Sequence, residues 1–79
     1  MFYVYILECA DSTYYIGSTS DLDRRVGEHN TSKRGARYTK MRRPVALRYS
    51  EQAATMSAAR VREAALKKLT RAQKAVLWK

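Results

Sequence analysis

The N-terminal segment constrains the fold of this chain more than any other part of the sequence. Residues 2–9 read Phe-Tyr-Val-Tyr-Ile-Leu-Glu-Cys, so aromatic and β-branched side chains would line both faces of an extended strand. A strand that is apolar on both faces is typical of the buried centre of a sheet. We therefore predict that this segment is a central strand, and that Cys9 at its end is a buried structural thiol.

The rest of the pattern predicts an α+β fold. Turn-forming residues at 10–13 indicate an antiparallel hairpin, and Ser20 is expected to cap the helix that follows. The expected strands are residues 2–9, 14–19 and 45–49. The expected helices are residues 20–30, 57–69 and 70–77, with one helical turn allowed within 31–43. The apolar stripe of the second of these helices is expected at Ala58, Val61, Ala65, Leu66 and Leu69. The predicted fold is a small three-stranded, mostly antiparallel sheet flanked by helices, in the order β-β-α-(turn)-β-α-α.

Length and composition exclude several classes of protein. A chain of 79 residues suits one domain, which we expect to span residues 1–79. One cysteine cannot form an internal disulfide bond, and no apolar run approaches the ~18 residues of a membrane span. One Cys and one His are too few for a zinc site, and three separate glycines cannot form a phosphate-binding loop. We therefore expect a cytoplasmic protein without a membrane segment or a small-molecule cofactor.

Positive charge is concentrated in the second half of the chain. The sequence has 16 Lys or Arg residues and 7 Asp or Glu residues, which gives a net charge of +9 at neutral pH. Residues 41–79 carry ten of the bases and only two of the acids, Glu51 and Glu63. This balance favours a polyanionic partner such as a nucleic acid. An acid kept in so basic a stretch is a candidate for a specific role.

Several motifs follow one another in a fixed order. They are Tyr3-Val4-Tyr5, Tyr15-Ile16-Gly17, Arg25, His29, Tyr38-Thr39, Arg42-Arg43-Pro44 and, in a helical segment, Glu63. Together they resemble the GIY-YIG nuclease superfamily, most closely its small stand-alone bacterial members, which consist of this domain alone. The resemblance covers almost the whole chain. The sequence departs from the family pattern at the first triad, which lacks its glycine, and in having no asparagine beyond Glu63 such as some members carry.

The resemblance implies a role for each matching residue. The catalytic residues so implied are Tyr5, Tyr15, Gly17, Arg25, His29 and Glu63. Arg25 would contact the scissile phosphate, and Glu63 would hold one divalent ion, Mg²⁺ or Mn²⁺. Tyr15, Tyr5 and His29 would activate the attacking water, and the glycine would let the substrate approach. The chemistry agrees, because one carboxylate together with substrate phosphate suffices to anchor Mg²⁺, and a guanidinium fork suits phosphate. Whether Tyr15 or His29 takes the proton of the water stays open.

The leading prediction is therefore a metal-dependent endonuclease that hydrolyses DNA, with RNA as an alternative substrate. The residues expected to contact nucleic acid are Arg24, Arg42, Arg43, Arg62, Lys67, Lys68 and Arg71. Two other functions stay open. One is a weakly active or inactive nucleic-acid-binding module that uses the basic half of the chain. The other is a protein-interacting domain that uses the apolar C-terminal residues Val76-Leu77-Trp78. For Glu63, the simple alternative is an exposed ion pair with Lys67, four residues later on a helix. The oligomeric state is left open.

A shared role for two tyrosines makes a geometric prediction about the hairpin. A two-residue turn at positions 11–12 would pair Ala10 with Thr13 and would put Tyr5 and Tyr15 on opposite faces of the sheet. A common site requires both side chains on one face. We therefore predict a loop of odd length, or a bulge, between the first two strands.

Overall fold

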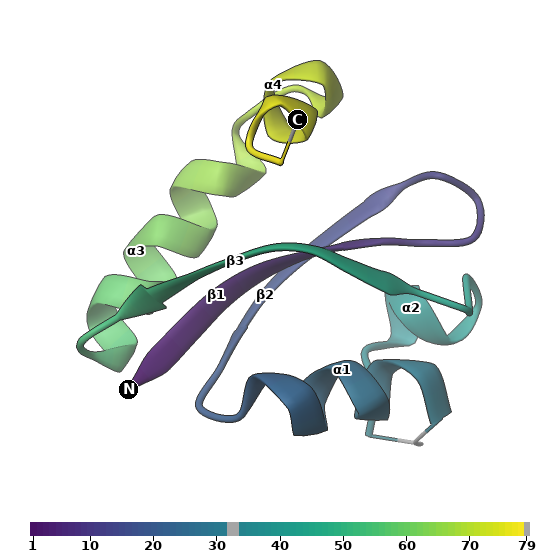
Figure 1. The fold of residues 1–79 in the computed structure, drawn as a ribbon, viewed down its shortest axis with the longest axis horizontal. Coiled ribbons are helices and arrows are strands. Elements are labelled where there is room, and N and C mark those ends of the chain that lie inside the picture. Colours follow the sequence, from purple (N-terminus) through teal and green to yellow (C-terminus); the bar gives the residue numbers. More distant parts are fainter. Residues whose placement is uncertain (32–33, 79) are drawn as a thin grey trace.

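The computed structural model describes residues 1–31 and 34–78, which form seven elements (Figure 1). The strands are β1 (Phe2–Glu8), β2 (Tyr14–Thr19) and β3 (Ala46–Ala53). The helices are α1 (Leu22–Thr31), α2 (Arg37–Lys40), α3 (Met56–Lys67) and α4 (Arg71–Val76). The predicted α+β fold and element order are confirmed, and α2 is the helical turn allowed in the basic loop.

The sheet has the strand order β2-β1-β3, and both pairings are antiparallel. The apolar N-terminal segment is therefore the central strand, as predicted, and Val4, Ile6 and Leu7 are fully buried within it. Cys9 is also buried and is a free thiol, in agreement with the expected structural role.

The hairpin between β1 and β2 has the predicted odd-length loop. Glu8 pairs with Tyr14, which leaves residues 9–13 as the connection, and Ser12 adopts a positive φ of 67° within it. The same register pairs Tyr5 with Gly17 and Leu7 with Tyr15. Because side chains alternate between the two faces of a strand, Tyr5, Tyr15 and Gly17 all lie on one face of the sheet.

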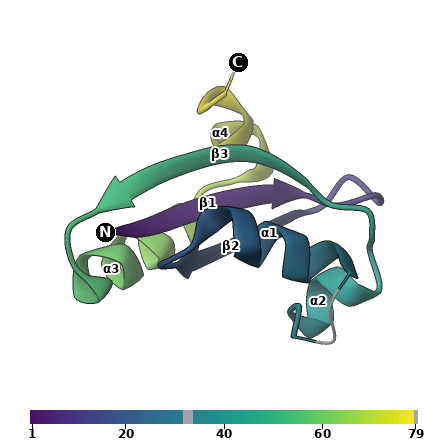
Figure 2. The same ribbon diagram turned by 60° about the horizontal axis from the view of Figure 1, so that its bottom comes forward.

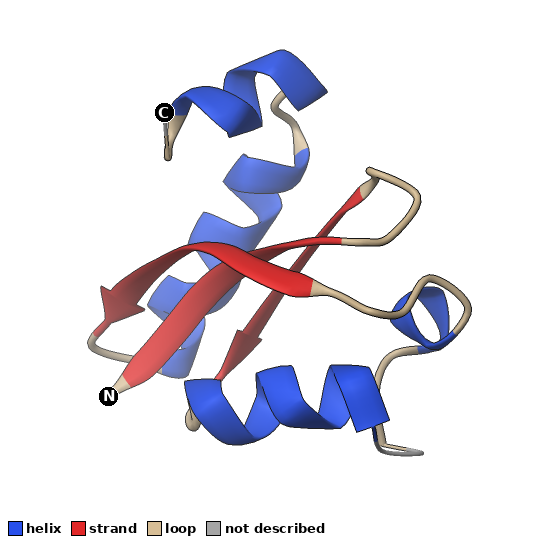
Figure 3. Cartoon of the chain, turned by 45° about the vertical axis from the view of Figure 1, so that its right-hand side comes forward, coloured by secondary structure: helices blue, strands red, loops and turns tan. Residues whose placement is uncertain are grey.

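Helices cover both faces of the sheet, with α1 and α2 on one side and α3 and α4 on the other (Figures 1, 2 and 3). The side of α1 is built from the odd-numbered residues of β1, and Leu22 and Val26 pack there against Tyr5 and Leu7. The side of α3 is built from Val4, Ile6, Ile16, Ala59 and Leu66. The tyrosine face of the sheet is thus the one that α1 covers.

Four details differ from the predictions. Asp21, not Ser20, caps α1, because its Oδ1 accepts the backbone N–H of Arg24 at 3.2 Å. β3 continues to Ala53, since its extra residues still pair with β1. A register shift in the β1–β3 pairing makes Arg48 an extra, bulged residue on β3. α3 begins at Met56, one residue early, because the side chain of Thr55 caps it.

The packing face of α3 is also different from the expected stripe. Ala58, Val61 and Ala65 are exposed, whereas Ala59 and Leu66 are the buried residues of this helix. Leu66 and Leu69 of the predicted stripe do pack on the core. At the C-terminal end, Trp78 contacts the same core and meets the ring of Tyr14 edge-on, with 5.2 Å between ring centroids. Trp78 is therefore an anchor for α4, which weakens the case for an apolar contact surface there.

Within the part of the chain that the structure describes, no helix is long and apolar enough to cross a membrane. The cytoplasmic location expected from the sequence stays a prediction.

Candidate active site

The centre of the candidate site is the pair formed by Tyr5 on β1 and Gly17 on β2. A Cβ atom added to Gly17 would lie 2.5 Å from the hydroxyl oxygen of Tyr5 and 3.2 Å from the ring of Tyr15. No side chain fits there without moving the tyrosine. The glycine therefore gives room to the Tyr5 ring itself, which differs from the expectation that it opens the backbone to the substrate.

His29 on α1 joins the two tyrosines. Its ring is 5.8 Å from that of Tyr5 and 5.0 Å from that of Tyr15, measured between centroids. Nε2 of His29 lies 2.8 Å from the Tyr5 hydroxyl, and Nδ1 lies 2.8 Å from Oγ1 of Thr39. Because His29 is 0% exposed and both ring nitrogens have partners, it is a closed link between elements rather than a group open to water.

Burial shifts the pKa values of His29 and Tyr5 in opposite directions. Desolvation, aided by the positive charges of Arg25 and Arg43, lowers the pKa of His29 to about 4. Desolvation, aided by Tyr15 and Glu63 and opposed by Arg25, raises the pKa of Tyr5 to about 12. Both side chains are therefore neutral at pH 7, and a proton on Tyr5 stays there.

Arg25 is oriented by several partners. Its Nη1 donates to the carbonyl oxygen of Arg34 at 2.7 Å and to Oε1 of Glu28 at 3.2 Å. The guanidinium also lies close enough to Tyr5 to lower the pKa of its hydroxyl, both as a charge and as a donor. Its side chain is 27% exposed, so the charge can still reach a ligand in solution. Arg25 and His29, four residues apart on α1, thus converge on the tyrosine face.

Glu63 approaches the site from α3. Its negative charge makes the smallest of the contributions that raise the pKa of Tyr5, and Tyr15 makes a small contribution to the raised pKa of Lys67, so this helix pair interacts with the tyrosines through charge. Oε2 of Glu63 is 2.8 Å from Nζ of Lys67, so the simple ion pair foreseen from the spacing is present. The pair does not exclude a further role, because the charge of the carboxylate also acts on Tyr5.

The residues present define which metal ion would suit the site. The described part of the chain contains no group of three or more His, Cys, Asp or Glu side chains that could enclose a metal. Glu63 is a single carboxylate whose charge acts on the phenol of Tyr5. Mg²⁺ and Mn²⁺ accept oxygen ligands, and Mg²⁺ commonly needs only one or two carboxylates when substrate phosphate supplies the rest. The donor set fits such an ion in the presence of substrate.

Three residues from the basic loop border the site, of which Arg42 was expected to contact nucleic acid and Thr39 and Tyr38 had no expected role. Thr39 is fully buried and bonds to His29. The ring of Tyr38 lies 6.0 Å from that of Tyr15, and the guanidinium of Arg42 stacks on Tyr38 at 3.9 Å from its centroid. These residues belong to α2 and the turn after it, so they reach the site only because the basic loop folds back against α1.

The residues expected to contact nucleic acid differ in the contacts they already make within the fold. Arg43 binds the carbonyl oxygens of His29 and Glu28 at 2.6 and 3.2 Å, so it holds the end of α1. Arg71 stacks on Tyr14, on the α3 side of the sheet. Four others take part in ion pairs: Arg24–Glu28, Arg42–Asp11, Arg62–Glu51 and Lys67–Glu63. Among the described residues, Lys68 is exposed and has no acidic partner.

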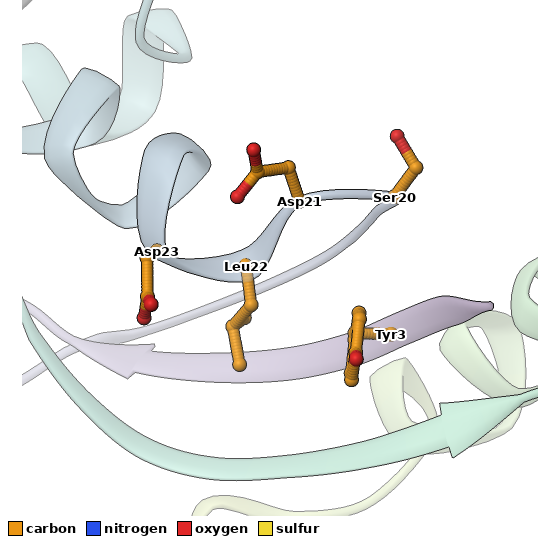
Figure 4. A pocket seen from close by; sticks show the side chains of 5 residues that line it. All are labelled: Tyr3, Ser20, Asp21, Leu22 and Asp23. Carbon is orange, nitrogen blue, oxygen red and sulfur yellow. The ribbon is translucent and has the colours of Figure 1, made fainter.

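A separate hollow of about 290 Å³ lies at the start of α1 (Figure 4). It is lined by Tyr3, Ser20, Asp21, Leu22 and Asp23. None of the candidate catalytic residues lines this hollow, and its two carboxylates would repel a phosphate. We therefore place the candidate site at the tyrosine face and not in the hollow.

Comparison with known proteins agrees with this architecture. Residues 1–75 match the family model described as the GIY-YIG catalytic domain. A UPF0213 protein of Syntrophus aciditrophicus is 51% identical over 77 residues, which are 98% of this chain and 88% of that protein. A UPF0213 protein of Halobacterium salinarum is 50% identical over 78 residues, which are 99% of this chain and 100% of that protein. Such relatives occur in archaea as well as bacteria.

Two solution NMR structures are similar to this chain. One is a UPF0213 protein from Bacillus halodurans, with 41% identity and a TM-score of 0.59, covering 98% of this chain and 82% of that one. The other is a protein from E. faecalis, with 47% identity and a TM-score of 0.63, covering 94% and 78% of the two chains. The fold described above is thus shared with experimentally determined relatives.

Proposed function

Because this chain belongs to the GIY-YIG catalytic domain family, we propose that it is an endonuclease that hydrolyses phosphodiester bonds, with DNA as its substrate. The observation that carries the proposal is a convergence of side chains from three elements. Tyr5 of the central strand is hydrogen-bonded to His29 and interacts with the charges of Arg25 and, more weakly, Glu63, although these residues are far apart in the sequence. A guanidinium, a carboxylate and phenols are the groups that phosphodiester hydrolysis needs.

Arg25 would bind the scissile phosphate. Its planar guanidinium presents donors in a fixed fork that matches two phosphate oxygens, and a charge of this kind stabilises the negative charge that grows on them during attack. The carbonyl of Arg34 and the carboxylate of Glu28 hold the side chain in place, so little ordering is needed when the substrate binds.

Glu63 would hold one divalent ion, Mg²⁺ or Mn²⁺, together with oxygens of the substrate. The bound ion supplies charge for the phosphate oxygens and makes water easier to deprotonate. Lys67 would compete with such an ion for the carboxylate, since its ammonium group pairs with Oε2, and once displaced it could turn to a neighbouring phosphate. The pair would thus change from an ion pair to two separate contacts with the bound complex.

Tyr15 is the residue we propose to receive or orient the attacking water. Its phenol is only partly buried and stands between the ring of His29 and the ring of Tyr38. His29 has both nitrogens engaged and is 0% exposed, which argues against direct contact with water. In this scheme the oxygen of water bonds to phosphorus while the bond to the leaving oxygen breaks. Tyr15 would orient the water by accepting a hydrogen bond from it, the proton that the water loses would pass to solvent, and the leaving oxygen would take a proton from solvent.

The test is cleavage of supercoiled plasmid, branched DNA and a matched RNA by the purified chain. We expect nicking with Mg²⁺ or Mn²⁺, none with EDTA, and a loss of at least about 100-fold in Glu63→Gln and Arg25→Ala, as for removal of a charged transition-state contact. Glu51→Gln and Arg48→Ala serve as matched controls, because Glu51 pairs with Arg62 and Arg48 pairs with Glu8. Nicking that survives in both Glu63→Gln and Arg25→Ala contradicts the proposal.

The ion pair at Glu63 and the incomplete first triad favour one second candidate, a nucleic-acid-binding module with little or no activity. The same samples distinguish it. Salt-sensitive binding of all the nucleic acids, with no cleavage under any metal condition, would support this function in place of the nuclease.

A further inference from the structure

A buried chain of hydrogen bonds runs from Tyr5 to the start of α2. The Tyr5 hydroxyl is 2.8 Å from Nε2 of His29, and Nδ1 of the same ring is 2.8 Å from Oγ1 of Thr39. Oγ1 of Thr39 is in turn 2.9 Å from the carbonyl oxygen of Ala36. His29 and Thr39 are both 0% exposed and Tyr5 is 1% exposed, so water does not compete for these bonds. The positions of the protons are therefore fixed by the partners alone.

The direction of the chain follows from its last member. A carbonyl oxygen only accepts, and the Thr39 hydroxyl donates to that of Ala36 at 2.9 Å; with its single proton placed there, Oγ1 accepts from Nδ1–H of His29, whereas a Thr39 proton on Nδ1 would leave the carbonyl without it. A neutral imidazole has one N–H, so Nε2 is left as an acceptor and receives the proton of the Tyr5 hydroxyl. The low pKa of His29, about 4, is consistent with a neutral ring.

The direction of the Tyr5 proton also affects Arg25. With its proton turned into His29, the Tyr5 oxygen keeps lone pairs that can accept from the guanidinium of Arg25, which interacts with this hydroxyl as a donor and as a charge. A guanidinium only donates, so it is matched by this arrangement and would be opposed by a Tyr5 proton pointing toward it. Which nitrogen of the buried His29 ring carries the proton thus decides whether the Tyr5 oxygen can accept a hydrogen bond from Arg25, the proposed phosphate-binding residue.

We propose that Thr39 is a positioning residue that holds His29 in the Nδ1–H tautomer, so that the Tyr5 oxygen faces and orients Arg25. The functional part of this inference rests on the proposed nuclease activity, in which Arg25 binds the phosphate. The tautomer itself does not depend on that activity and can be measured separately.

A second donor, the backbone N–H of Ala36, favours the opposite tautomer of His29 and makes the role of Thr39 testable. The backbone N–H of Ala36 points at Nδ1 of His29 from 3.4 Å, and it can be satisfied there only when Nδ1 carries no proton. In Thr39→Val the hydroxyl that accepts from Nδ1–H is gone, while this N–H stays. We expect the ring to change to the Nε2–H tautomer, which reverses the bond to Tyr5.

The first test is NMR of the ring nitrogens. His29 is the only histidine of the chain, so labelling histidine with ¹⁵N gives the spectrum of this one ring. We expect a proton on Nδ1 in the wild type and in Thr39→Ser, and on Nε2 in most molecules of Thr39→Val. Thr31→Val is the matched control, because the Thr31 hydroxyl bonds to the carbonyl of Gly27 on the exposed side of α1. It should keep the proton on Nδ1.

The second test is cleavage under the conditions given for the proposed function. Thr39→Val should lower kcat about tenfold with little change in KM, the size of effect given by one ordinary hydrogen bond. Thr39→Ser should recover wild-type kcat, because it keeps the hydroxyl, and Thr31→Val should not change it. A purely structural role would lower the amount of folded protein and leave kcat per folded molecule as it was.

Each result decides the matter. A wild-type ring with its proton on Nε2 overturns the inference, whether or not Thr39→Val folds. A folded Thr39→Val that keeps Nδ1–H and full kcat also overturns it. If the wild type cleaves no nucleic acid, the proposed function fails, and the NMR spectra still decide the role of Thr39 in setting the tautomer.

Discussion

At the scale of single residues, Gly17 is the position where size matters most. Replacement by alanine would place a Cβ atom 2.5 Å from the Tyr5 oxygen, so the ring has to move away from His29. We expect Gly17→Ala to destabilise the fold by about 1–3 kcal/mol, as overpacking does, and to abolish cleavage. Urea unfolding and the nicking assay measure the two effects.

Gly27 provides the matched control. An added Cβ at Gly27 would meet nothing within 4 Å, and the residue lies inside α1. Gly27→Ala should therefore stabilise the chain by up to about 1 kcal/mol, because alanine is the better helix former. Equal destabilisation by the two substitutions would contradict the assignment of Gly17 as a contact point for Tyr5.

His29 makes a prediction about acid. Its pKa is about 4 in the folded state and about 6.5 in an unfolded chain, so the unfolded state takes up the proton first as the pH falls. The stability that comes from neutral His29 is complete above pH 6.5 and is lost between pH 6.5 and 4, with a total of up to about 3 kcal/mol. Urea unfolding at several pH values in this window measures the loss.

An NMR titration of the same ring gives an independent check. The ring of His29 should stay neutral down to about pH 4 in the folded protein. A titration midpoint near 6.5 in folded protein would show that the ring is open to water. The His29→Asn variant should lose the part of the pH dependence that lies between 4 and 6.5, even if it is less stable throughout.

The residues of the site were foreseen from the sequence to different degrees. Arg25 and His29 could be placed together because they are one helical turn apart, and the register argument placed Tyr5 and Tyr15 on one face. Thr39 could not be placed, because its contact with His29 depends on the path of a polar loop without a periodic pattern. The burial of His29 has the same origin, since α2 closes over a ring that a helical wheel leaves at the edge.

At the scale of elements, α3 has a pair that connects the metal proposal with the helix surface. The ammonium group of Lys67 lies 2.8 Å from Oε2 of Glu63, the carboxylate proposed to hold the ion. Lys67→Gln should therefore raise the affinity of the DNA-free protein for Mn²⁺ by a factor of about 1.4 to 5, since an exposed pair of this kind contributes about 0.2–1 kcal/mol. Titration calorimetry with Mn²⁺ alone measures the change.

A neighbouring lysine controls for net charge. Lys68→Gln removes the same charge from the adjacent residue, which has no acidic partner within the described chain, and should change Mn²⁺ affinity less. Glu63→Gln should remove the binding. Unchanged affinity in Lys67→Gln would mean that the ion does not bind at Glu63.

Elements with strong local signals were predicted well, and those defined by their partners were not. β1 is identified by its continuous apolar run, and α4 by the capping box between Thr70 and Gln73, which is present. The packing face of α3 was assigned wrongly because alanines occur all around this helix and do not define a side. No sequence pattern indicated the contact between the end of α1 and the start of β3 either. There, the side chain of Asn30 accepts from the N–H of Val45 at 2.7 Å and donates to its C=O at 3.0 Å.

At the scale of the whole molecule, the net charge of +9 is distributed between two kinds of basic residue. Some are neutralised within the fold, as in the pair of Arg62 with Glu51 at 2.7 Å. Others, such as Arg60 on α3 and Lys68 at its C-cap, are exposed and have no acidic partner in the part of the chain described. The second kind can release counterions from a nucleic acid without first breaking a contact in the protein.

This difference predicts the salt dependence of DNA binding. Each phosphate contact contributes about 0.9 to the slope of log K against log salt. Arg60→Gln and Lys68→Gln should each lower the slope by nearly one such contact, whereas Arg62→Gln should lower it by less than half of one, because Glu51 already holds that guanidinium. Fluorescence anisotropy with a labelled duplex, without divalent metal and over a range of salt, measures the slopes. Equal changes in all three variants would mean that Glu51 releases Arg62 to the DNA, and that total charge rather than its pairing within the fold governs binding.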